Sequence, residues 1–72
     1  MNKTYTINNR KCEVEIHETR TIESESQDMH TSYIAYIYDQ NGYRRYVADC
    51  DSVRDARETL RKFSRTMQAI EH

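Results

Sequence analysis

Residues 33–49 read Tyr-Ile-Ala-Tyr-Ile-Tyr-Asp-Gln-Asn-Gly-Tyr-Arg-Arg-Tyr-Val-Ala-Asp, from Tyr33 to Asp49, and this stretch predicts a β-hairpin. Two runs rich in Tyr, Ile and Val flank Asn41-Gly42. That pair is favoured in a two-residue type I′ turn, because both central positions of the turn need a positive φ. Successive strand residues point to opposite faces of a sheet. The hairpin therefore offers one face to a core and the other to solvent or a partner.

The expected cross-strand partners form two sets, one on each face. With a two-residue loop, the apolar set pairs Tyr33 with Cys50, Ala35 with Ala48, and Ile37 with Tyr46. The mixed set pairs Ile34 with Asp49, Tyr36 with Val47, and Tyr38 with Arg45. We assign the apolar set to the core and the mixed set to the exposed side. A three-residue loop would change these partners, and a bulge would exchange the faces of one strand.

Two more strands are expected before the hairpin. Residues 3–8 form a short one with Tyr5 and Ile7 on the same side, and Asn8-Asn9 then offers a turn. Residues 11–22 alternate between an apolar and a polar face. The apolar face holds Cys12, Val14, Ile16 and Ile22, and the polar face holds Glu13, Glu15, His17 and Thr19.

Two interruptions follow along this strand. Glu18 and Arg20 break the apolar side, which indicates a bulge or a departure of the strand from the core. Residues 23–31 are polar and have no periodicity, which predicts an exposed loop between two strands.

After Asp51 the spacing of apolar residues changes to that of a helix. Ser52 can cap this helix, with Asp55 three residues later in a capping box. The apolar stripe consists of Val53, Ala56, Leu60, Phe63, Met67 and Ile70. The order β-β-β-β-α predicts an α+β fold: a small antiparallel meander of three to four strands, with one C-terminal helix packed on one face. Residues 1–72 are expected to form a single domain.

Composition predicts a thin core. Leu, Ile, Val and Phe supply 11 of the 72 residues, and six Tyr add rings that can be buried in part. A chain this short is marginally stable alone, so we expect a homodimer or a partner-bound protein. No apolar run reaches the about 20 residues of a membrane span, and the N-terminus lacks a signal peptide's apolar segment. We therefore expect a cytoplasmic protein without a membrane partner, whose Cys12 and Cys50 are reduced thiols.

Catalytic and metal-binding motifs are not found. Cys12, His17, His30 and Cys50 lack the close paired spacing of zinc ligands. Asp28 and His30 could be an acid/base pair, but no nucleophile elbow, phosphate loop or metalloprotease helix accompanies them. We predict a protein that is not an enzyme and needs no metal, cofactor or small-molecule ligand.

The mixed hairpin face is the predicted protein-binding surface. Tyr and Arg are enriched at interface hot spots, and a thin core favours burial of a second sheet face. The predicted surface comprises Ile34, Tyr36, Tyr38, Arg45 and Val47, beside Glu13 and Glu15. The opposing interpretation is that Tyr is a good strand former that can lie half exposed without a function.

Nucleic-acid binding is the alternative, although 11 Lys and Arg against 12 Asp and Glu give no basic domain. Arg54, Arg57, Arg61 and Arg65 recur at helical spacing and form one stripe. Pairing of Asp55 and Glu58 with Lys62 or nearby Arg would make this an ordinary solvated surface.

A resemblance leads to a second form of the nucleic-acid alternative. Residues 38–46 (Tyr-Asp-Gln-Asn-Gly-Tyr-Arg-Arg-Tyr), followed by residues 52–56 (Ser-Val-Arg-Asp-Ala), resemble the strand-turn-strand-helix of the arm-type DNA-binding domains of tyrosine recombinases. This resemblance covers about half of the chain. It implies that Tyr36, Tyr38, Arg44 and Arg45 lie in a DNA groove.

The function expected from the sequence is that of a non-enzymatic interaction module. By size and character the chain is similar to accessory proteins and inhibitors encoded by phages and plasmids, including those directed at host defence systems. Such a protein acts by covering the surface of another macromolecule. A structural homodimer without a heterologous partner is the further alternative.

Overall fold

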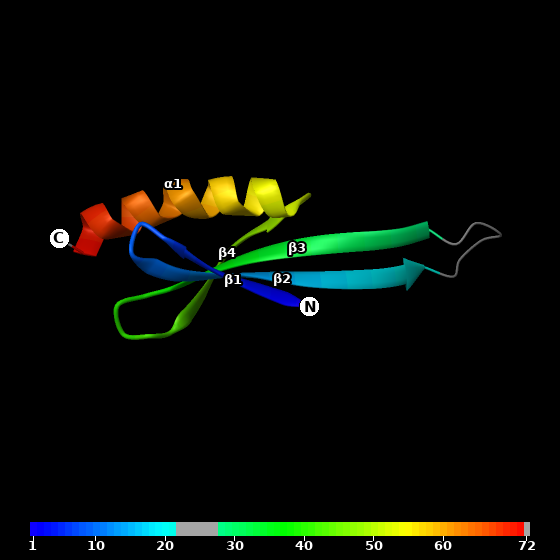
Figure 1. Ribbon diagram of the computed structural model, residues 1–72, viewed down its shortest axis with the longest axis horizontal. Helices are drawn as coiled ribbons and strands as arrows, with labels where there is room; N and C mark the ends of the chain where they lie inside the picture. The colour runs from blue at the N-terminus through cyan, green and yellow to red at the C-terminus, as the bar shows by residue number, and fades with distance from the viewer. Residues whose placement is uncertain (22–27, 72) are drawn as a thin grey trace.

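The computed structural model describes residues 1–21 and 28–71 as four strands and one helix. The strands are β1 (Asn2–Ile7), β2 (Arg10–Thr21), β3 (Asp28–Tyr38) and β4 (Arg44–Cys50), and α1 spans Val53–Glu71. They pair in the order β1-β2-β3-β4, every pair antiparallel. The predicted α+β meander with a C-terminal helix is therefore confirmed (Figure 1).

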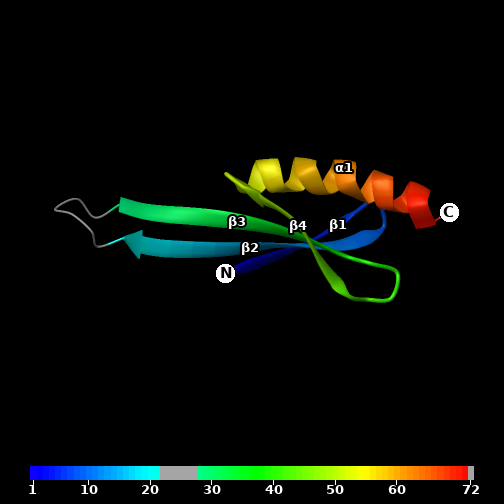
Figure 2. The ribbon, with the colours of Figure 1, turned by 180° about the vertical axis from the view of Figure 1, so that it is seen from behind.

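The core lies between α1 and one face of the sheet. Its fully buried apolar residues come from β2, β3 and α1: Cys12, Val14, Ala35, Ile37, Ala56 and Leu60. Seen from both sides, α1 lies along a single side of the sheet (Figures 1 and 2). Among the described residues, no element covers the opposite side, which we call the outer face.

The helix begins and is anchored as its sequence indicates. The backbone N–H of Asp55 donates to Ser52 Oγ at 3.1 Å, which confirms the predicted N-cap. Further along α1, the amide of Asn8 donates to Ser64 Oγ at 2.8 Å, so the turn after β1 is bonded to the helix. The buried stripe is narrower than predicted, because Phe63 and Ile70 remain 37% and 78% exposed.

The turns at Asn8-Asn9 and at Asn41-Gly42 differ in loop length and in backbone conformation. Asn8 and Asn9 have φ values of 51° and 63°, and their flanking residues Ile7 and Arg10 are paired. A two-residue loop with two positive φ values is the type I′ pattern. The predicted turn at Asn8-Asn9 is thus confirmed, and it has the geometry that the sequence pattern favours at Asn41-Gly42.

The loop at Asn41-Gly42 has three residues, so the prediction of a two-residue turn is wrong. Only Gly42 has a positive φ, of 85°. Its N–H donates to the Asp39 carbonyl at 3.0 Å, and the Asp39 N–H donates to the Tyr43 carbonyl at 3.0 Å. This is a type I turn followed by a left-handed glycine. The Asp39 carboxylate stabilises it by accepting from the N–H groups of Asn41 and Tyr43, both at 2.9 Å.

The longer loop changes the cross-strand partners near it. The observed pairs are Tyr36 with Tyr46, Ile37 with Arg45, and Tyr38 with Arg44. A register shift between Ala35 and Tyr36 then restores the predicted pairs Tyr33–Cys50, Ile34–Asp49 and Ala35–Ala48. The predicted pairs Ile37–Tyr46, Tyr36–Val47 and Tyr38–Arg45 are wrong, because a three-residue loop and a bulge replace the regular ladder.

The three-residue loop also exchanges the faces of the first part of β4, and the bulge restores the predicted faces from Ala48 onward. Tyr46, predicted to be in the core, stands opposite Tyr36 and is 59% exposed. Val47, predicted to be exposed, is partly buried against the core. Arg45 stands opposite the buried Ile37 rather than on the outer face. The hairpin end bends away from α1 (Figures 1 and 2), as expected where a strand carries a bulge.

Strands β2 and β3 extend past the rest of the molecule as a two-stranded arm. β1 pairs with β2 as far as Glu15, and β4 pairs with β3 as far as Tyr33. Beyond these points residues 17–21 and 28–32 pair with each other (Figure 1). The extents of 54 × 19 × 16 Å and the radius of gyration of 14.5 Å reflect this arm, since a compact chain of this length would have about 11 Å.

Two predictions concern this arm. Near Glu18 the sequence indicates a bulge or a departure from the core; the pairing of β2 with β3 is regular from Cys12 to Thr21, and the strand leaves the core, so the second alternative is the one observed. β3 begins at Asp28, so residues 28–31 belong to a strand rather than to the predicted loop. The remainder of that loop, and Ile22, lie outside the described residues.

No helix in the described part of the chain is both long enough and apolar enough to cross a membrane.

Candidate interaction surface on the outer sheet face

Alternation along the strands places aromatic and charged side chains together on the outer face. Strands β2, β3 and β4 contribute the residues that alternate with their core-facing positions. These residues are Lys11, Glu13, Glu15 and His17 from β2, Ile34, Tyr36 and Tyr38 from β3, and Arg44, Tyr46 and Asp49 from β4.

Arg44 is the centre of the polar contacts on this face. Its Nη1 lies 2.9 Å from Glu13 Oε1 and 3.7 Å from Glu15 Oε2. Its guanidinium also lies 4.0 Å from the centroid of the Tyr36 ring. One cation thus joins two carboxylates of β2 to an aromatic ring of β3. The contact with Glu13 and the two carboxylate charges raise the pKa of Arg44, so this cation stays charged.

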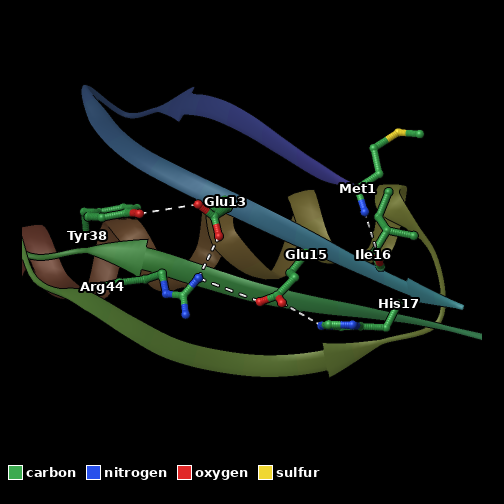
Figure 3. Close-up of polar contacts among 7 residues, drawn as sticks. All are labelled: Met1, Glu13, Glu15, Ile16, His17, Tyr38 and Arg44. Atoms are coloured by element: carbon green, nitrogen blue, oxygen red, sulfur yellow. Dashed lines mark hydrogen bonds and ion pairs between the residues drawn. The ribbon is translucent and has the colours of Figure 1, made fainter.

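The contacts continue on both sides of Arg44 (Figure 3). Towards the loop after β3, the Tyr38 hydroxyl donates to Glu13 Oε2 at 3.4 Å, and Lys11 Nζ lies 4.6 Å from the centroid of the Tyr38 ring. Towards the arm, His17 Nε2 lies 2.7 Å from Glu15 Oε1. We call this connected set the outer-face network: Lys11, Glu13, Glu15, His17, Tyr36, Tyr38 and Arg44.

A pair of tyrosines lies beside the network. The rings of Tyr36 and Tyr46 have centroids 6.3 Å apart and planes inclined at 75°, an edge-to-face arrangement. Partial burial, followed by the hydrogen bond and charge of Glu15, raises the pKa of Tyr36 above its ordinary value. Tyr36 therefore stays neutral at physiological pH. Tyr46 lies beside it and is 59% exposed.

The predicted binding residues divide between two sides of the sheet. Ile34, Tyr36, Tyr38, Glu13 and Glu15 lie together on the outer face. Arg45 and Val47 do not join them. Arg45 Nε instead lies 3.0 Å from Asp39 Oδ2, which is part of the loop contacts.

Two outer-face residues are absent from the protein-binding surface predicted from the sequence. Tyr46 is predicted in the core, and Arg44 is named on the exposed sheet face only in the DNA-binding alternative. A signal for their true position exists in the sequence: Asp39 stands three residues before Gly42, which is typical of a type I turn with Asp first and Gly last. That turn gives the three-residue loop, and with it the observed partners of Arg44 and Tyr46.

The arginines of α1 contrast with those of the sheet. Arg54, Arg57, Arg61 and Arg65 are exposed, and no ion pair to them is found among the described residues. Nor do the described residues contain the expected pairing of Asp55 or Glu58 with Lys62. Arg57 lies 5.0 Å from the ring centroid of Tyr5, and this is a cation–π contact.

The two cysteines do not form a disulfide bond with each other. Cys12 is buried, Cys50 is partly buried, and both are free thiols, as predicted. Burial raises the pKa of the Cys12 thiol, so it is not poised as a nucleophile. Within residues 1–21 and 28–71, no three His, Cys, Asp or Glu side chains are grouped to hold a metal ion.

Comparison of the chain with models of protein families, with curated proteins and with solved structures gives no match.

Proposed function

We propose that the protein is a non-enzymatic interaction module that binds a protein partner through its outer face. The observation that carries this proposal is the position of the tyrosine pair. Tyr36 and Tyr46 lie on the sheet face opposite α1, where no described element covers them, and Tyr46 is 59% exposed. Arg44, stacked on Tyr36, adds the other residue type that is typical of hot spots.

The outer-face network supports binding by ordering these side chains in advance. Arg44 is bonded to Glu13 at 2.9 Å and stacked on Tyr36, so it has few free rotamers to lose. Side-chain ordering costs about 0.5–1.5 kcal/mol per flexible side chain when a partner binds. A face that is ordered in its free state avoids much of this cost.

The charges on the outer face favour a protein over nucleic acid as its occupant. Arg44 already contacts two carboxylates, and Asp49 lies on the same face. A phosphate backbone placed there would compete with Glu13 and Glu15 for Arg44 and would approach the exposed carboxylate of Asp49. A DNA groove at Tyr36, Tyr38, Arg44 and Arg45 is disfavoured for this reason, and because Arg45 does not share the face.

The mechanism that we propose is occlusion. The face is mixed, with aromatic rings at Tyr36 and Tyr46, an aliphatic group at Ile34 and balanced charges around them. It fits a partner surface that has a groove for the exposed ring of Tyr46 and polar groups at the rim of that groove. An accessory protein or inhibitor of the phage or plasmid type needs nothing more than such coverage, and we expect it to act in the cytoplasm.

The experiment compares two tyrosine variants. Tyr46→Ala removes an outer-face ring, whereas Tyr43→Ala removes a ring of similar exposure, 59% against 65%, from the hairpin loop. Tagged forms of both variants and of the wild type are expressed in the native cells, and co-purifying proteins are quantified by mass spectrometry. We expect one protein to be retained by the wild type and by Tyr43→Ala, and reduced about tenfold or more by Tyr46→Ala.

Two outcomes would contradict the proposal. One is equal retention of the partner by both variants. The other is a solution mass of two copies of the 8.7 kDa chain for the wild type that falls to one copy for Tyr46→Ala. That second result would assign the outer face to a homodimer.

A further inference from the structure

We propose that the exposed arginines of α1 form a second binding surface, which takes the phosphate backbone of nucleic acid. We call this surface the arginine stripe: Arg54, Arg57, Arg61 and Arg65. The proposal does not depend on the function of the outer face, because α1 lies on the other side of the sheet (Figures 1 and 2). Both surfaces can be occupied together, which would bring a protein partner to nucleic acid.

The stripe has a spacing and a length that suit a phosphate backbone. Steps of three and four residues keep the four side chains on one flank of a helix. At about 1.5 Å of rise per residue, Arg54 and Arg65 are separated by about 16 Å along the axis. A strand of duplex DNA carries one phosphate per about 3.4 Å of its axis, so a stripe of this length is matched to several consecutive phosphates.

Within the described part of the chain, most of these cations have no acidic partner. In the sheet, Arg44 and Arg45 lie within 3.0 Å of carboxylate oxygens. Among the described residues, no carboxylate is bonded to Arg54, Arg61 or Arg65. Guanidinium groups with uncommitted planar donors bind phosphate in a bidentate manner.

The first part of the arginine stripe also borders a concave surface. A groove of about 420 Å³ is lined by Arg54, Arg57 and Arg61 together with Val53 and Glu58. The guanidinium of Arg57, over the ring of Tyr5 at 5.0 Å, is held at the β1 side of this groove. Three cations against the one carboxylate of Glu58 make the groove positive, although the whole chain has a net charge of −1.

The side-chain composition distinguishes nucleic acid from an acidic protein as the occupant. Apart from Val53 and the Tyr5 ring, the stripe offers no apolar anchor. Protein interfaces depend on an apolar, desolvated centre. A row of cations without one is typical of backbone recognition, which is electrostatic and independent of sequence.

The test measures fluorescence anisotropy of a labelled 20-base-pair DNA duplex, and of RNA of the same sequence, from about 20 to 200 mM salt. Because three to four phosphates are neutralised, log K should fall with log salt with a slope of about −3. We expect Arg57→Gln/Arg61→Gln to weaken binding about tenfold or more. The matched control Arg45→Gln removes an arginine already paired with Asp39, and should change binding less than about twofold.

Two further variants complete the test. Arg54→Gln/Arg65→Gln should also weaken binding about tenfold or more, and it replaces Arg57→Gln/Arg61→Gln if circular dichroism shows that the first double variant is unfolded. Tyr46→Ala should leave nucleic-acid binding unchanged, so failure of this proposal is distinguishable from failure of the outer-face proposal. The proposal is overturned if no binding occurs at about 20 mM salt, or if Arg45→Gln is as harmful as the stripe variants. Competition by polyglutamate as effective as by nucleic acid would also overturn it.

Discussion

Tyr36 and Tyr46 stand opposite each other on β3 and β4, with their rings edge to face at 6.3 Å. This pairing exists because a three-residue loop shifts β4 by one residue relative to the arrangement expected for a two-residue loop. A shift of one residue exchanges the faces of a strand. It brings Tyr46 to the outer face and turns Arg45 away from it, and so it determines the composition of the candidate surface.

Gly42 is the residue on which this loop depends. Its φ is 85°, and a Cβ added to it would meet no atom within 4 Å. Substitution is therefore opposed by backbone conformation alone. We expect Gly42→Ala to lower the free energy of unfolding by about 1 kcal/mol, measured by urea denaturation. Gly42→Asn is the control, because Asn tolerates a left-handed conformation better. Equal losses for Ala and Asn would contradict this explanation.

Leu60 tests the thin core. It is fully buried against the sheet, whereas Phe63 on the same helix is 37% exposed. Leu60→Ala should lower the free energy of unfolding by about 2–5 kcal/mol, which is enough to unfold a marginal domain of this size. Phe63→Ala should cost clearly less. Thermal denaturation followed by circular dichroism compares the two, and a larger effect at Phe63 would mean that α1 packs with a different face.

Arg44 tests the outer-face network. Without its cation, Glu13 and Glu15 would keep like charges on the same face with no guanidinium between them. We expect Arg44→Gln to lower the urea midpoint, by less than Leu60→Ala does, because the contacts are partly exposed. The difference from the wild type should shrink in about 1 M salt. An effect that does not depend on salt would assign the role of Arg44 to packing on Tyr36.

Asp39 predicts a pH dependence of stability. Hydrogen bonds from the Tyr43 backbone, with further ones from Arg45 and Asn41, lower the pKa of Asp39 below its ordinary value of 3.8. The folded state then binds fewer protons than the unfolded state, so this contribution is fully present above 3.8 and is lost progressively as pH falls from that value through the lower pKa of the folded state. We expect Asp39→Asn to destabilise the protein in urea at pH 7 and much less at about pH 3. A loss of equal size at both pH values would contradict this assignment.

Two elements predicted correctly from the sequence, α1 and the turn after β1, are those with signals in nearby residues. The helix follows from the spacing of Ala56 and Leu60 and from Ser52 as its cap, and the first turn follows from Asn8-Asn9. Both elements depend on residues that are close to one another in the sequence. The second turn was predicted wrongly because the preference of Asn41-Gly42 for a two-residue loop competes with the hydrogen bonds of Asp39, which favour three residues.

The candidate surface was predictable only in part, for a related reason. The pairing of β2 with β3 is regular, so alternation correctly places Tyr36, Tyr38, Glu13 and Glu15. The positions of Arg44 and Tyr46 depend on a loop and on a bulge, which periodicity does not report. The contacts of Arg44 with β2 involve strands far apart in sequence, and no local pattern encodes them.

The most direct test of partner binding by the outer face places a benzophenone amino acid at the position of Tyr46 and exposes the native cells to ultraviolet light. The same amino acid at the position of Phe63, which is partly exposed beside the core on α1, is the control. We expect a discrete adduct of the 8.7 kDa chain with another protein from position 46 and none from position 63. An adduct between two copies of the chain, an equal adduct from both positions, or no adduct from position 46 would contradict the claim that the outer face binds a heterologous protein.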